Sequence, residues 1–249
     1  MSASHIRELI SAVFGSEAHP LAAWYAGLLE RVSPLRAFTE ANANKIRKKA
    51  RNARTPEDQR DLRCELAVAA ALADRRSPLS YEPLAAAGSR GPDFLLRHKG
   101  HTDVYVEVSR LRPARGQAHD PAGRLAAVLC SKLGQLVAGS VNLLVVVSDA
   151  APYAAADVGA TIQSLRRRVD ARDDAYFAFR GLAGARSFAQ ALPRLSAVHV
   201  VAPAAPAEAL FLHPQARHPM PADLVRAAAA WGLAASVGPP SDPSPEAET

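Results

Sequence analysis

Two acidic residues and one lysine are spaced so that they could form a single hydrolytic site. Asp93 follows Pro92, Glu107 lies fourteen residues further along, and Lys132 another twenty-five. Two carboxylates held close together repel each other unless a proton or a cation lies between them. Mg²⁺ prefers oxygen ligands, so the pair predicts a site for Mg²⁺ or Mn²⁺. The chemistry of such a site would be metal-assisted hydrolysis.

Residues 91–109 predict the β-hairpin that would bring the two acids together. The turn is expected at residues 99–101, where Gly100 supplies a positive φ. Pairing around this turn places Asp93 opposite Glu107, with Cβ atoms about 5 Å apart. Because side chains alternate along a strand, the acids share one face and the intervening valines point to the other.

The helix that follows the hairpin should aim Lys132 at the same place. Asp120 is the expected N-cap of this helix and Pro121 its first residue. Lys132 falls within an apolar stripe at helical spacing. The apolar residues of the stripe are Leu125, Val128, Leu129 and Leu136. A buried ammonium without a partner is unfavourable, so Lys132 should meet a carboxylate or open onto a wet cleft.

A further acid, Glu65, lies on a helix that precedes the hairpin. Thr55 followed by Pro56 is typical of a helix start, and the helix should continue to about Asp74. Glu65 shares a broad face with apolar residues and therefore points toward the core. It either supports the residues that bind a metal, or binds the metal through water, or forms an ion pair with an arginine from elsewhere in the chain.

This pattern resembles the motif of the PD-(D/E)xK nuclease superfamily, over roughly residues 55–150. The residues that carry the resemblance are Pro92-Asp93, Glu107-Val108-Ser109, Glu65, and Lys132 and Gln135 of the following helix. The resemblance implies that Asp93 and Glu107 bind metal, with the Val108 carbonyl as a further ligand, and that Glu65 supports the site.

The sequence departs from that motif at one position. Ser109 stands where the family usually has a lysine, two residues after the Glu. The resemblance implies that Lys132 supplies the amine from the next helix, where Gln135 would hold the lysine or the phosphate backbone. Ser109 has no visible His partner, so a serine nucleophile is poorly supported.

Basic residues are predicted to contact nucleic acid. A net charge of +6 and a pI near 9.7 suit a polyanionic partner. The densest basic run, KIRKKARNAR, lies just before the expected core, and either contacts phosphates or is a solvated helix face. Further arginines follow Glu107. The residues in this prediction are Lys45, Arg47, Lys48, Lys49, Arg51, Arg110 and Arg112.

The expected fold is an α/β restriction-endonuclease-like core with a mixed central sheet flanked by helices. Residues 1–54 should form an N-terminal helical extension, 55–236 the nuclease domain, and 237–249 a disordered tail. Residues 141–148 and 195–202 are apolar runs without alternation, which predicts strands buried on both faces. Cys64 and Cys130 fall in apolar helical contexts, which predicts buried thiols.

The expected function is a metal-dependent phosphodiesterase that acts on nucleic acid, with DNA favoured. Two alternatives stay open: a nuclease-fold protein that binds nucleic acid without cleaving it, and an α/β protein-interaction module. The longest apolar runs fall far short of the roughly 20 residues that span a bilayer, and no basic-then-apolar signal layout begins the chain. A cytoplasmic protein without membrane contact is expected. Its oligomeric state is open, a homodimer included.

Overall fold

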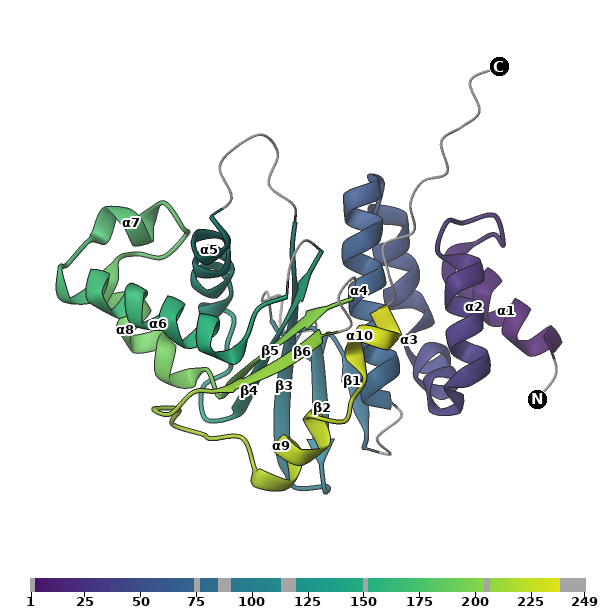
Figure 1. Cartoon of the computed structure of the whole chain (residues 1–249). Coiled ribbons are helices and arrows are strands. Elements are labelled where there is room, and N and C mark those ends of the chain that lie inside the picture. Colours follow the sequence, from purple (N-terminus) through teal and green to yellow (C-terminus); the bar gives the residue numbers. More distant parts are fainter. Residues whose placement is uncertain are drawn as a thin grey trace, which may run out of the picture.

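The computed structural model describes residues 3–73, 77–84, 91–112, 120–149, 152–203 and 207–237. In this described part of the chain, a six-stranded mixed sheet has helices on both faces (Figure 1). The prediction of an α/β protein with a mixed central sheet flanked by helices is therefore confirmed.

Along the described ranges, four helices come first and three strands follow, after which helices lie between the third and fourth strands, between the fourth and fifth, and after the sixth. The helices are α1 (Ala3–Phe14), α2 (Ala22–Arg31), α3 (Ser33–Asn52), α4 (Pro56–Ala73), α5 (Pro121–Leu133), α6 (Ala155–Asp170), α7 (Asp174–Ala178), α8 (Ala185–Ala191), α9 (Ala222–Ala228) and α10 (Leu233–Val237). The strands are β1 (Leu79–Tyr81), β2 (Phe94–His98), β3 (Thr102–Leu111), β4 (Val141–Ser148), β5 (Ala197–Ala202) and β6 (Ala207–Leu212). Val237 closes α10, whereas the remainder of the predicted tail, 238–249, lies outside the described residues.

The strands lie in the sheet in the order in which they occur in the sequence. β1, β2 and β3 are antiparallel, β3, β4 and β5 are parallel, and β6 is antiparallel to β5. Parallel neighbours need a crossover connection, and α5 supplies it between β3 and β4. All residues of β4 and β5 are buried, which confirms the two strands predicted to be covered on both faces.

Buried apolar side chains of the sheet belong to two hydrophobic clusters, one on each face of the sheet. The first contains Val106 of β3 together with α1–α4 and α10; the second contains Leu144 of β4 together with α5–α8. Figure 1 shows these two groups of helices on opposite sides of the sheet. Cys64 and Cys130 are both buried and unpaired, as predicted.

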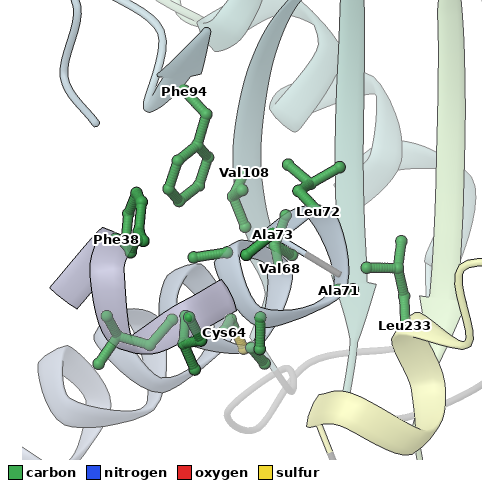
Figure 2. Packing of buried hydrophobic residues seen from close by; sticks show 14 of the residues in the cluster. Phe38, Cys64, Val68, Ala71, Leu72, Ala73, Phe94, Val108 and Leu233 are labelled. Carbon is green, nitrogen blue, oxygen red and sulfur yellow. The ribbon is translucent and has the colours of Figure 1, made fainter. Parts of the chain in front are cut away.

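The N-terminal helices share the core of the sheet rather than forming a separate one. Phe38 of α3 lies 6.3 Å from Phe94 of β2 between ring centroids. Figure 2 shows Phe38 and Phe94 close to Val68 and Leu72 of α4, all within one cluster. The predicted boundary after residue 54 therefore falls inside one continuous core, and α3 is placed to contribute side chains to whatever site the hairpin builds.

The hairpin forms in the predicted register. Phe94 pairs with Val106, and Gly100 in the turn has a φ of +76°. The same register, extended by one residue, places Asp93 opposite Glu107. Asp93 lies immediately before β2, whereas Glu107 is inside β3.

Both helices that flank the hairpin begin where the sequence predicts. The Asp120 side chain accepts a hydrogen bond from the Gly123 N–H at 2.8 Å, which caps α5. The Thr55 hydroxyl accepts one from the Asp58 N–H at 3.1 Å, which caps α4. These caps satisfy backbone donors that have no partner within the helix, and they set the register in which α4 and α5 present Glu65 and Lys132.

Candidate active site: a cleft of carboxylates and lysines

A cleft of about 640 Å³ lies where α3, α4 and α5 meet the hairpin. Its lining residues are Lys49, Glu65, Glu82, Leu84, Gly91, Pro92, Asp93, Glu107, Ser131, Lys132 and Gln135. The structure thus brings together all four residues predicted to be catalytic: Asp93, Glu107, Lys132 and Glu65. Gln135 joins them, whereas Ser109 is not among the lining residues.

Glu107 and Lys132 form a direct ion pair across the cleft. The Lys132 Nζ donates to the Glu107 Oε1 at 2.5 Å, and the Glu107 side chain is only 4% exposed. The other carboxylate oxygen of Glu107, Oε2, is buried and has no hydrogen-bond partner within the described part of the chain. A buried charged oxygen without a partner is unfavourable, so Glu107 either carries a proton, as its raised pKa favours, or needs a ligand at this oxygen.

Asp93 is held by the backbone of the opposite strand. Its Oδ2 accepts from the Val108 N–H at 2.9 Å, and its Oδ1 lies 3.4 Å from the Lys49 Nζ. The N–H and C=O of a strand residue point to the same side of the strand. The Val108 carbonyl is therefore expected to face Asp93, as its predicted role requires.

Glu65 reaches the cleft from α4 and meets two donors. Its Oε2 accepts from the Lys49 Nζ at 2.5 Å and from the Tyr81 hydroxyl at 2.8 Å. The sequence left open whether Glu65 supports the site or pairs with an arginine. In the structure its cationic partner is not an arginine but Lys49, which itself lines the cleft.

The carboxylates of the cleft are difficult to ionise together. Burial is the largest cause that raises the pKa of Glu107 to about 7; the charge of Asp93 adds to it, while Lys132 acts in the opposite direction. Burial likewise raises the pKa of Glu65 to about 7, again with Asp93 adding to it and Lys49 opposing. Both shifts come mainly from burial, with a smaller contribution from the charge of Asp93, and both favour the protonated carboxyl group.

The lining residues of the cleft carry more negative than positive formal charge. Four lining carboxylates (Glu65, Glu82, Asp93 and Glu107) face two lysine ammonium groups, which leaves a formal charge of −2 when all are ionised. One divalent cation would neutralise that charge. Protons on Glu65 and Glu107, whose pKa values are raised, would neutralise the same charge.

The donor set fits a hydrated ion with few protein ligands. Nowhere in the described ranges are three or more His, Cys, Asp or Glu residues arranged to hold a metal ion. Mg²⁺, however, is commonly bound through one or two carboxylates and keeps several waters. Asp93 and the unpartnered oxygen of Glu107 supply two carboxylates of this kind.

Sequence reasoning missed the part that Lys49 and Glu82 play in the cleft. Lys49 lies three residues after Ile46 and four before Ala53, both buried, so helical spacing already placed it on the inner stripe of α3. Glu82 carries no comparable signal. It follows β1 in a left-handed conformation with φ of +44°, and only the fold brings its Oε1 to 3.4 Å from the Lys49 Nζ.

The prediction that Arg110 contacts nucleic acid is corrected by its burial. Its side chain is 1% exposed and forms ion pairs with Glu57, Asp61 and Asp149. Arg110 continues the face of β3 that carries the valines, and that face is covered by α4. A guanidinium enclosed by three carboxylates is a structural group, not a free phosphate ligand.

The other predicted contacts divide into internal and exposed side chains. The Lys45 Nζ donates to the Tyr81 and Glu82 carbonyls, and the Arg47 Nε donates to the Ala12 carbonyl. These two side chains tie α3 to its neighbours. The side chains that remain on the surface are those of Lys48, Arg51 and Arg112, of which Arg112 pairs with Asp61.

Comparison with known proteins finds no match: no family model fits the chain, and no curated protein or solved structure is similar to it. The fold and the cleft define a class, an α/β protein whose mixed sheet carries a carboxylate–lysine site. Across the described residues, no helix has both the length and the apolar character needed to cross a membrane.

Proposed function

We propose that the chain is a metal-dependent phosphodiesterase that cleaves nucleic acid on a restriction-endonuclease-like core. The observation that carries this proposal is the environment of Glu107, whose buried carboxylate has one oxygen paired with Lys132 and one with no partner among the described residues. Ser109 stands at the position where the motif usually has a lysine. Lys132, from the helix after the hairpin, would supply the amine instead. The antiparallel hairpin, the crossover helix α5 and the parallel strand β4 are consistent with such a core.

Each residue of the cleft has a distinct part in the proposed reaction. Asp93 and Glu107 would hold the ion, together with the Val108 carbonyl. The ion would supply Lewis-acid stabilisation of charge on the phosphate and would lower the pKa of water. Lys132 holds Glu107 in place, orients the attacking water and offsets negative charge that develops on the phosphate oxygens. Gln135 contacts the phosphate backbone at the edge of the cleft.

Exposed positive charge on α3 supports a nucleic-acid substrate. Lys48 and Arg51 are exposed on the same helix that sends Lys49 into the cleft. Exposed lysine and arginine bind phosphates without regard to sequence and give affinity that falls with salt. The net charge of +6 acts in the same direction.

Cleavage assays with charge-neutral variants test the proposal directly. Asp93→Asn and Glu107→Gln are each expected to lower the Mg²⁺-dependent cleavage rate about 100-fold or more, because each removes a metal ligand whose effect is several kcal/mol. The measurement is the initial rate on single- and double-stranded DNA and on RNA, with Mg²⁺, Mn²⁺ or EDTA.

The matched control is Asp103→Asn, which neutralises an acid of the same hairpin. Asp103 is 39% exposed and pairs with Arg97 away from the cleft lining, so this variant should cleave as the wild type does. Equal rates in all four proteins would rule the nuclease assignment out. Binding that weakens with salt but gives no cleavage would indicate a binding protein, and the absence of both would indicate an interaction module.

Thermal melting should detect the ion independently of activity. At pH 8, Mn²⁺ at about 100 Kd is expected to raise the melting temperature by roughly 5–10 °C, because a ligand that binds only the folded state stabilises it. The effect should be smaller at pH 5.5, where protons on Glu65 and Glu107 compete with the metal, given that their pKa values are raised.

Without metal, the stability of the protein should change with pH in the opposite direction to the stabilisation by Mn²⁺. An acid whose pKa is higher in the folded state binds more protons there, so the metal-free protein should lose stability as the pH rises from about 4.5 to about 7. A melting temperature that does not respond to Mn²⁺ at either pH would contradict the metal site.

A further inference from the structure

Lys49 is surrounded by carboxylates in the way that a bound cation would be. Its Nζ lies 2.5 Å from the Glu65 Oε2, 3.4 Å from the Glu82 Oε1 and 3.4 Å from the Asp93 Oδ1. The same ammonium lies 4.9 Å from the centroid of the Tyr81 ring, within the range of a cation–π interaction. Three oxygens and an aromatic face thus enclose one positive charge.

The ammonium remains charged in this position. Burial acts to lower the pKa of Lys49, but the charges of Glu65 and Asp93 outweigh it and the pKa is raised. The Lys49 side chain is 26% exposed, so it reaches the carboxylates from the rim of the cleft.

The two lysines divide the cleft into two halves. Lys132 pairs with Glu107, one oxygen of which has no partner in the described ranges, whereas Lys49 pairs with Glu65, Glu82 and the Oδ1 of Asp93. A divalent ion beside Glu107 finds a free ligand, but one placed between Glu65 and Glu82 meets the Lys49 charge at close range. Like charges a few ångströms apart in a partly buried site repel strongly.

We propose that Lys49 is a built-in cation that occupies the second cation position of the cleft, so that the site takes one divalent ion where its carboxylates would hold two. The inference rests on the proposed function, because the first ion is the one held by Asp93 and Glu107. Lys49 is therefore a positioning residue: it sets the metal stoichiometry and fixes Glu65 and Asp93. Removing its charge should open a second site for a divalent cation among oxygens of Glu65, Glu82 and Asp93.

The number of Mn²⁺ ions bound by the full chain tests this inference without any activity measurement. Isothermal titration with Mn²⁺ at pH 8 should give one equivalent for the wild type and two for Lys49→Met. The double variant Lys49→Met/Glu82→Gln should return to one equivalent, because it lacks a ligand of the second site. Lys48→Met removes a lysine from the exposed face of the same helix and should bind one.

The possible results separate the two proposals. No Mn²⁺ bound by the wild type would overturn the metal-dependent function and this inference together. One equivalent in both the wild type and Lys49→Met would overturn the inference alone. Lys49→Met would be unfolded in the absence of metal only if the missing charge is needed for folding. In that case Mn²⁺ should restore the fold, as measured by circular dichroism, because the ion replaces the missing charge. A variant that stays unfolded with Mn²⁺ would also overturn the inference.

Discussion

A Lys132→Met variant is expected to cleave nucleic acid about 10²–10⁴-fold more slowly than the wild type while it binds Mn²⁺ at least as tightly. The rate falls because a positioned group that handles the attacking water contributes about that factor. Metal affinity is kept because the variant frees the Glu107 Oε1, which the Lys132 Nζ occupies at 2.5 Å, and removes a positive charge from beside the ion. Single-turnover rates and a Mn²⁺ titration on the same preparation measure the two effects.

The control for this prediction is Lys99→Met. Lys99 is 60% exposed at the hairpin tip and pairs with Asp223, so its loss removes the same charge away from the cleft and should change neither quantity. If Lys132→Met cleaves at the wild-type rate, Lys132 is only the ion-pair partner of Glu107 and does not replace the motif lysine.

Replacing Arg110 with methionine is expected to lower the free energy of unfolding by about 3 kcal/mol. Breaking a buried ion pair by removing one partner costs about 3–5 kcal/mol. The lower end of this range applies because the three acidic partners keep contact with water: Glu57 is 27% exposed, Asp61 36% and Asp149 15%. The arginine joins the first turns of α4 to β3 and to the end of β4. Urea unfolding followed by circular dichroism measures the change.

Arg112→Met is the matched control for Arg110. Arg112 is 53% exposed and shares Asp61 with Arg110, so its loss should change the free energy of unfolding by no more than about 1 kcal/mol. Similar losses in the two variants would contradict the structural role assigned to Arg110.

Acid sensitivity should distinguish these two variants further. The hydrogen bond from Arg110 is the largest cause that lowers the pKa of Glu57. A lowered pKa gives stability that is present above the unfolded value and is lost as the pH falls through the folded one. The wild type should therefore lose stability on acidification below about pH 4.5, and Arg110→Met should lose less over the same range, as urea midpoints at successive pH values would record.

The elements nearest the candidate site were predictable because their signals are local. The register of the hairpin follows from the length of its turn and the period of two along a strand, which is why Asp93 and Glu107 lie opposite each other as expected. The start of α5 follows from Asp120 and Pro121, and the helical period then aims Lys132 at Glu107. Burial of β4 on both faces follows from its unbroken apolar run.

For the basic residues before the core, sequence spacing alone does not predict which groups each side chain contacts. KIRKKARNAR indicates a charged helix face, and helical spacing places Lys49 on its inner stripe, but only the packing of α3 against α4 and β1 supplies the partners of Lys49 and Lys45. Arg110 could be placed by alternation on the covered face of β3, yet its three partners come from α4 and from the end of β4. The identity of a partner that is distant in sequence cannot be read from spacing.

By itself the sequence determined the hairpin, the helix starts and the meeting of Asp93, Glu107 and Lys132, since each depends on hydrogen-bond and side-chain periods within a few dozen residues. The tertiary structure alone decided the electrostatics of the cleft. It added Lys49 and Glu82 to the cleft, left one oxygen of Glu107 without a partner in the part of the chain that the structure describes, and enclosed Arg110. The physical reason is that charge interactions depend on distance through space and on exclusion of water, and both exist only once the layers have packed.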